Sequence, residues 1–151
     1  MRSYQSLLQK IDRGIIRMNG NITSLLSRWA LFIIFFWFGF LKVISVSLAD
    51  PLVEALLKET LPFSFEYFIV FLGIYEMCIG LLFVIPRCER IAIALFITHM
   101  ITAFFPLILL KDMTWAGSFI PTLEGQYIIK NGALIALVVS VASRLRPLSK
   151  S

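Results

Sequence analysis

The sequence predicts an all-α fold, a four-transmembrane-helix bundle with both termini on the cytoplasmic side, and three observations point to it. Hydrophobic residues make up 59% of the 151 residues and charged residues only 15%, whereas an ordinary soluble domain has about 45–50% and about 25%. Four apolar runs each approach the roughly 20 residues that cross a hydrocarbon core. Lys and Arg, finally, are concentrated on one side of those runs.

The four predicted spans lie at about residues 28–48, 65–86, 90–110 and 124–143. Each span should be a helix, because an unpaired strand would leave its backbone polar groups unsatisfied in lipid. Residues 28–143 therefore form the membrane domain. An amphipathic segment at residues 1–27 precedes it, and a basic cytoplasmic tail at residues 144–151 follows it.

The orientation of the spans follows from the distribution of the basic residues. The N-terminal segment, the turn between spans two and three, and the tail together carry ten: Arg2, Lys10, Arg13, Arg17, Arg28, Arg87, Arg90, Arg144, Arg146 and Lys150. The two remaining loops carry only Lys58 and Lys111. The positive-inside rule therefore predicts that the N- and C-termini both face the cytoplasm.

The N-terminal segment has the pattern of an interfacial amphipathic helix. Its apolar residues recur at helical spacing, and its basic residues lie largely on the opposite face. We expect this helix to lie on the anionic cytoplasmic leaflet, and we expect Asn19-Gly20-Asn21 to turn the chain into the membrane. The location predicted is the bacterial plasma (inner) membrane. A mitochondrial transit peptide is the alternative, but Asp12 and the later charge bias argue against it.

The two outer loops also contain structural signals. Asp50 is expected to cap a short helix over residues 51–60, with Pro51 at its first position, lying over the outer mouth of the bundle. The second loop, residues 111–122, contains Trp115, which is typical of an interface anchor.

Several function classes are disfavoured. The basic residues flank hydrophobic runs and do not form a polar face, so nucleic-acid binding is not expected. Cys78 and Cys88 are ten residues apart, about 15 Å along a helix, which exceeds the roughly 7 Å limit for a disulfide. One histidine and no suitably placed cysteine do not predict a metal site.

Four ionisable residues lie inside the predicted spans: Lys42, Glu76, His99 and Lys130. An unpaired charge at mid-helix costs roughly 2.5–3.5 kcal/mol on insertion scales, so such residues usually face a bundle interior. Lys42 and Lys130 each lie six residues from the outer end of their runs, and Glu76 and His99 lie near the midplane. We therefore predict a polar pocket in the outer half of the bundle.

Helical spacing extends this candidate ligand site. Gly73, Glu76 and Gly80 share one stripe of span two, where small residues let a neighbouring helix approach. Pro106 in span three cannot bond the carbonyl of Thr102, so a kink or polar opening is expected near that depth. The candidate ligand-binding residues are Lys42, Glu76, His99, Gln126, Tyr127 and Lys130.

The geometric prediction is that Lys42, Glu76 and Lys130 face one interior, with at least one lysine bonded to Glu76. Two lysines for one glutamate would leave positive charge for an anion, a polar ligand or a deprotonated lysine. The alternatives are an ion pair that only fixes helix register, and a packing role for His99.

Three sequence segments resemble the DoxX-like superfamily of small four-span membrane proteins, including the related reactive-chlorine-resistance membrane proteins. They are GFLK at residues 39–42, GIYEMCIG at residues 73–80 and EGQYIIKN at residues 124–131. The resemblance covers about residues 28–143 and implies a four-helix bundle. In some members it also implies a role beside quinone-linked oxidation or oxidative-stress defence. The chain has no CxxC motif of the kind found in quinone-coupled thiol oxidoreductases.

Three functional hypotheses follow, and the sequence leaves catalysis open. The first is a redox-associated membrane protein that binds a quinone or a similar ligand in the outer-half pocket. The second is a small proton-coupled transporter or permease component, which with four spans would need to oligomerise. The third is a non-catalytic assembly or accessory subunit. Expected partners are the lipid bilayer and either a membrane redox protein or further copies of this chain.

Overall fold

The computed structural model describes the backbone of residues 2–145 and the side chains of residues 22–145, and it is mostly helical. The helices are α1 (Arg2–Val43), α2 (Asp50–Thr60), α3 (Phe65–Val84), α4 (Glu89–Phe104), α5 (Pro106–Leu109), α6 (Lys111–Thr114) and α7 (Leu123–Ala142). A small antiparallel hairpin of β1 (Trp115–Gly117) and β2 (Ile120–Pro121) precedes α7.

Four helical segments within the described chain are long and apolar enough to cross a membrane: Ile22–Val43, Phe65–Val84, Glu89–Leu109 and Leu123–Ala142. The predicted number of spans is confirmed, and three of the four agree closely in their limits. The first span begins and ends earlier than predicted. Length and composition are therefore those of a multi-pass integral membrane protein, whereas the cytoplasmic placement of the termini stays a prediction.

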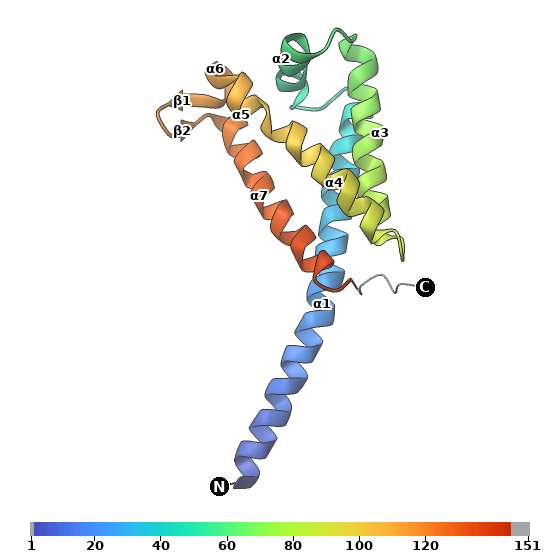
Figure 1. The fold of residues 1–151 in the computed structure, drawn as a ribbon, viewed down its shortest axis with the longest axis vertical. Helices are drawn as coiled ribbons and strands as arrows, with labels where there is room; N and C mark the ends of the chain where they lie inside the picture. The colour runs from blue at the N-terminus through green and yellow to red at the C-terminus, as the bar shows by residue number, and fades with distance from the viewer. Residues whose placement is uncertain (1, 146–151) are drawn as a thin grey trace, which may run out of the picture.

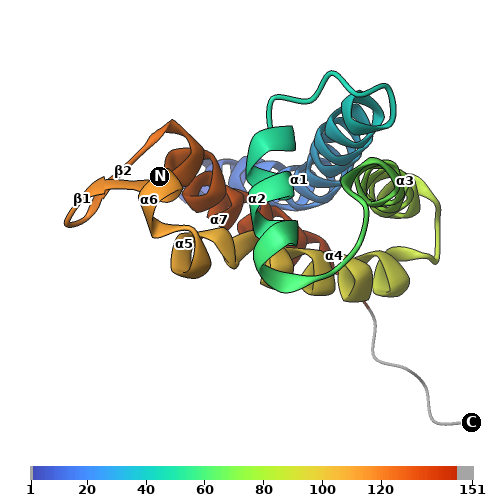
Figure 2. The same ribbon diagram turned by 90° about the horizontal axis from the view of Figure 1, so that it is seen from above.

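The four long helices form a ring in which α1 packs on α3, α3 on α4, α4 on α7 and α7 on α1. Figure 1 shows that the α3–α4 turn and the end of α7 lie towards the same end of the bundle, from which the first half of α1 projects. The helix α2 and the hairpin lie at the opposite end, and Figure 2 shows α2 lying across the bundle there. Because each long helix runs from one end of the bundle to the other, four of them bring the end of α7 back to the end from which α1 enters.

The predicted turn at Asn19-Gly20-Asn21 is wrong. The helix α1 runs without interruption over 42 residues, from Arg2 to Val43. Figure 1 shows its first half as a straight extension beyond the other helices. The side chains that predicted an interfacial segment at residues 1–27 lie, up to residue 21, outside the described side chains, as does the predicted tail from residue 146 onward.

The predictions for the first outer loop and for Pro106 have different outcomes. A helix does occupy the first outer loop, but it begins at Asp50, its N-cap residue is Ala49, and no side chain caps it. The prediction that Asp50 caps this helix is therefore wrong. The kink at Pro106 is present, because α4 ends at Phe104 and the Phe105 amide donates to the carbonyl of Thr102 at 3.2 Å. Pro106 has no amide hydrogen to continue the ladder.

The core lies between the four long helices, and the outside of the bundle is apolar as well. Buried core residues come from each of them: Leu31, Phe35, Ile79, Phe83, Ala92, Phe96, Met100, Val138 and Val141. Large apolar side chains also face outward, among them Trp37 at 60%, Phe71 at 63% and Ile101 at 56% exposure. A soluble protein rarely exposes so much contiguous apolar surface, whereas lipid accepts it.

Candidate functional site

Close backbone contact between α1 and α3 positions the site. A Cβ added to Gly39 would lie 2.5 Å from the carbonyl oxygen of Gly73, and one added to Gly73 would lie 2.6 Å from that of Gly39. About two turns further along α3, a Cβ on Gly80 would lie 3.0 Å from the amide nitrogen of Phe36. Any side chain would force the helices apart, so the predicted small-residue stripe does bring two backbones together.

Lys42 and Glu76 meet across this contact. The Lys42 ammonium nitrogen, Nζ, lies 2.6 Å from Glu76 Oε2, and each residue is only 6% exposed. The prediction that a lysine bonds Glu76 is confirmed. The predicted separation of six residues between Lys42 and the end of its span is wrong, because α1 ends at Val43 and so places Lys42 in its last turn. There its charge also interacts favourably with the negative end of the helix dipole.

His99 on α4 completes a cluster of three ionisable side chains from three helices. Its Nε2 lies 3.4 Å from Glu76 Oε1, the carboxylate oxygen that Lys42 does not contact. The second ring nitrogen, Nδ1, is buried and has no hydrogen-bond partner. We call Lys42, Glu76 and His99 the polar cluster.

Two aromatic rings flank His99. The ring of Phe35 on α1 lies 5.5 Å from the imidazole between centroids, and that of Tyr75 on α3 lies 6.2 Å away. The Tyr75 hydroxyl donates to the carbonyl of Leu95 at 2.9 Å, which fixes α3 against α4. The sequence analysis did not single out Tyr75, although it precedes Glu76. Tyr75 lies about 100° around the helix from Glu76 and so falls outside the stripe that Gly73, Glu76 and Gly80 share, which is why helical spacing did not predict its proximity to His99.

The three candidate residues on α7 do not join the polar cluster. Gln126, Tyr127 and Lys130 are exposed, and Lys130 Nζ lies over the ring of Tyr127 at 5.2 Å. The prediction that Lys130 shares an interior with Lys42 and Glu76 is therefore wrong. With Lys130 outside, Lys42 alone balances Glu76, so the predicted surplus of positive charge is not present in the cluster.

The rotation of α7 explains where Lys130 lies. Gly125 packs so tightly on α6 that an added Cβ would overlap the carbonyl of Thr114, and Ile128 is buried in the same helix. Lys130 follows Ile128 by two residues, about 200° around the helix. Its side chain points back along α7 over Tyr127, towards the start of the helix, as a snorkelling lysine does.

A second ionic contact, which the sequence analysis missed, lies at the other end of the bundle. Arg28 Nε donates to the carbonyl of Phe83 at 2.6 Å, and Arg28 Nη1 lies 3.0 Å from Glu89 Oε1. Arg28 Nη2 also approaches the carbonyl of Ile85 at 3.5 Å. We call Arg28 and Glu89, with these carbonyls, the turn clamp. In the sequence, Arg28 contributes only to the charge bias that predicts the orientation of the spans.

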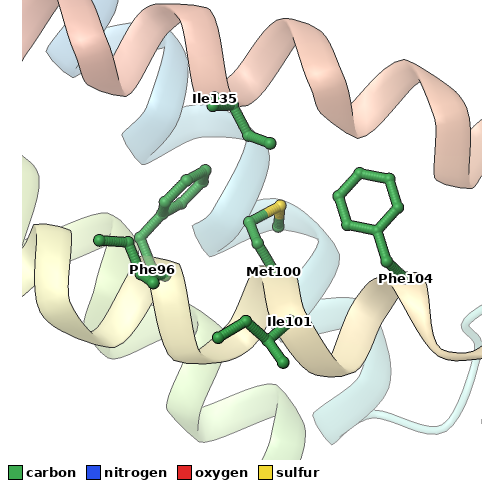
Figure 3. Close-up of a pocket in the computed structure, with 6 residues that line it drawn as sticks. Phe96, Met100, Ile101, Phe104 and Ile135 are labelled. Atoms are coloured by element: carbon green, nitrogen blue, oxygen red, sulfur yellow. The ribbon is translucent and has the colours of Figure 1, made fainter.

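An open apolar groove of about 320 Å³ lies between α4 and α7. Figure 3 shows Phe96, Met100, Ile101 and Phe104 along α4, with Ile135 of α7 facing them. Ile97 completes the lining, so the six candidate ligand residues do not contribute to this groove. The groove and the polar cluster therefore occupy different parts of the surface of α4.

The chemistry available to the polar cluster is hydrogen bonding and proton exchange. Within the described residues, no three His, Cys, Asp or Glu side chains are grouped so that they could hold a metal ion. In comparisons with protein-family models, curated proteins and solved structures, nothing matched this chain.

Proposed function

We propose that this chain is a DoxX-like, multi-pass protein of the bacterial inner membrane, with both termini in the cytoplasm. In this proposal the polar cluster binds the head group of a quinone or a similar small ligand. The observation that carries the proposal is the buried Nδ1 of His99, which has no hydrogen-bond partner. The Lys and Arg distribution supports the orientation, and the resemblance stated above supports the association with redox chemistry.

An unpartnered buried polar atom favours binding of a small ligand. Leaving such a group unpaired costs about 1–3 kcal/mol, which a ligand regains by supplying the missing hydrogen bond. The atom is buried, so a ligand reaches it only after neighbouring side chains move, and the flanking rings of Phe35 and Tyr75 are the nearest described candidates. Aromatic walls with one polar contact are typical of sites for small apolar molecules.

Each residue of the polar cluster has a separate task in this proposal. His99 contacts the head group through Nδ1, Glu76 holds the other ring nitrogen, and Lys42 balances the charge of Glu76. A bound quinone would supply the capacity to accept or donate electrons and protons. We leave Gln126, Tyr127 and Lys130 out of the proposed site, because they are exposed on α7.

The test is to identify what co-purifies with the protein. Protein purified in mild detergent should carry a quinone, in its oxidised or its quinol form, detectable by mass spectrometry of the extracted lipids. His99→Phe, which keeps an aromatic ring between Phe35 and Tyr75, should lose it. Lys130→Ala should retain it. An intact, folded protein that carries neither quinone nor quinol, and binds neither when they are added, would contradict the proposal.

A second candidate function is a non-catalytic assembly subunit, and the closed Lys42–Glu76 pair favours it. An ion pair at 2.6 Å that is almost fully buried can serve only to fix the register of α1 on α3. Under this alternative, the double variant Lys42→Met/Glu76→Gln should remain folded and keep the cellular phenotype. Loss of the phenotype in a well-folded double variant would exclude a purely structural cluster.

A further inference from the structure

We infer that the ligand of the polar cluster is a hydrogen-bond donor at His99, so that the site prefers a hydroxyl-bearing, quinol-type head group over the oxidised quinone. The inference rests on the proposed ligand site and deepens it. The two imidazole nitrogens of His99 have different surroundings. One of them faces a carboxylate, and the other faces no described partner.

The carboxylate of Glu76 decides which nitrogen carries hydrogen. Oε2 is within 2.6 Å of the ammonium of Lys42, which favours the ionised form of Glu76. An ionised carboxylate has no hydrogen to donate, so the approach of Nε2 to Oε1 at 3.4 Å favours the tautomer with its hydrogen on Nε2. The hydrogen of a neutral ring is then on Nε2, and Nδ1 presents a lone pair.

Charge balance argues for the neutral ring. Lys42 already balances Glu76, and both residues are 6% exposed. A positively charged imidazole would add a second buried cation to one carboxylate, with no further acidic partner for it at this site. An uncompensated charge is expensive to remove from water, so the neutral cluster is the favoured state.

A lone pair at Nδ1 selects the chemistry of the ligand. A quinone carbonyl has only lone pairs and cannot bond to it, whereas the hydroxyl of a quinol can donate to it. A bound quinone would therefore place its carbonyl oxygen against the lone pair of Nδ1, and two buried acceptors that face one another repel. A site built around one such bond rejects analogues that lack the required hydroxyl.

The first experiment reads the tautomer without any ligand. The chain has one histidine, so protein labelled with 15N-histidine gives nitrogen signals from His99 alone. We expect Nδ1 to show the chemical shift of an unprotonated ring nitrogen and Nε2 that of a protonated one. Glu76→Gln, whose amide can also donate, should allow the other tautomer to appear. A hydrogen on Nδ1 in the unmodified protein would overturn the inference.

The second experiment measures preference with three probes that share one ring and tail: a decyl-substituted benzoquinol kept reduced, its quinone, and its dimethyl ether. We expect the quinol to bind about tenfold more tightly than either of the others, the ratio given by about 1.4 kcal/mol. His99→Phe, which lacks Nδ1, should bind all three probes weakly and without preference, and Lys130→Ala should keep the preference. Equal binding of quinol and quinone by the unmodified protein would overturn this inference but keep the proposed site. Failure of all three to bind folded protein would overturn both.

Discussion

The polar cluster and the turn clamp both tie α1 to the α3–α4 hairpin, but they solve different electrostatic problems. Arg28 lies opposite the end of α3, where it donates to the carbonyl of Phe83 and approaches that of Ile85, which also accepts from the Cys88 amide at 3.4 Å. A guanidinium with five donors can satisfy both carbonyls and Glu89 together. Glu76, by contrast, lies in the middle of α3, where the helix itself uses every backbone group.

The difference shows why one contact needs glycine and the other does not. A charge at a helix end finds backbone partners, and a long arginine can reach them from a distance. A glutamate at mid-helix needs a side chain from a neighbouring helix, and it obtains one because Gly39 and Gly73 let the two backbones meet. The polar cluster therefore depends on close helix packing, whereas the turn clamp depends on the length of the arginine side chain.

The largest expected effect is at the polar cluster. Glu76→Gln leaves the buried ammonium of Lys42 without a counter-ion, and we expect it to lower the free energy of unfolding by about 3–5 kcal/mol. The measurement is equilibrium unfolding in mixed detergent micelles. The double variant Lys42→Met/Glu76→Gln should recover most of the loss. A single variant as stable as the unmodified protein would show that the charge of Lys42 reaches water unaided.

A smaller effect is expected where the two backbones touch. Gly39→Ala places a methyl group against the carbonyl of Gly73, and such overpacking costs about 1–3 kcal/mol. Gly132→Ala on α7 is the matched control, because its added Cβ has no neighbour within 4 Å. The same unfolding assay applies to both. Equal stabilities for the two variants would mean that α1 and α3 can separate at little cost.

The turn clamp should respond about as strongly to loss of its carbonyl contacts, and more weakly to loss of its ion pair. Arg28→Met removes charged hydrogen bonds to carbonyls of the α3–α4 turn, which we expect to cost about 1.5–3 kcal/mol. Glu89→Gln keeps those bonds and removes only a partly exposed ion pair, so its effect should stay below about 1 kcal/mol. If Glu89→Gln were the more damaging variant, the ion pair and not the carbonyls would hold the turn.

The smallest effect is expected outside both contacts. Lys130 is exposed and touches only the ring of Tyr127 among the contacts described above, so Lys130→Ala should change stability by no more than about 0.5 kcal/mol. Lys42→Ala in parallel tests the contrast between a buried and an exposed lysine. A strongly destabilised Lys130→Ala variant would indicate that this face of α7 packs against another molecule.

Much of the fold and part of the candidate site could be predicted before any coordinates. The four spans follow from apolar run length, because a bilayer allows only a helix of that length there. The pairing of Glu76 also follows, since a short acidic side chain near the midplane cannot reach water. The continuity of α1 through Asn19-Gly20-Asn21 could not be read from composition. These residues disfavour a helix by only about 1 kcal/mol each, which context readily overrides.

The sequence by itself determined that four segments are long and apolar enough to cross a membrane and which charge had to be paired, because both follow from the cost of placing polar groups in lipid. The tertiary structure alone decided which lysine pairs with Glu76. Hydropathy treats Lys42 and Lys130 alike, and either can direct its amine towards the outer interface. Packing distinguishes the two lysines. The contact of Gly39 with Gly73 places Lys42 beside Glu76, whereas the contact of Gly125 with Thr114 leaves Lys130 on the exposed side of α7. Such contacts depend on the shapes of two helices at once, and a single run of residues does not contain them.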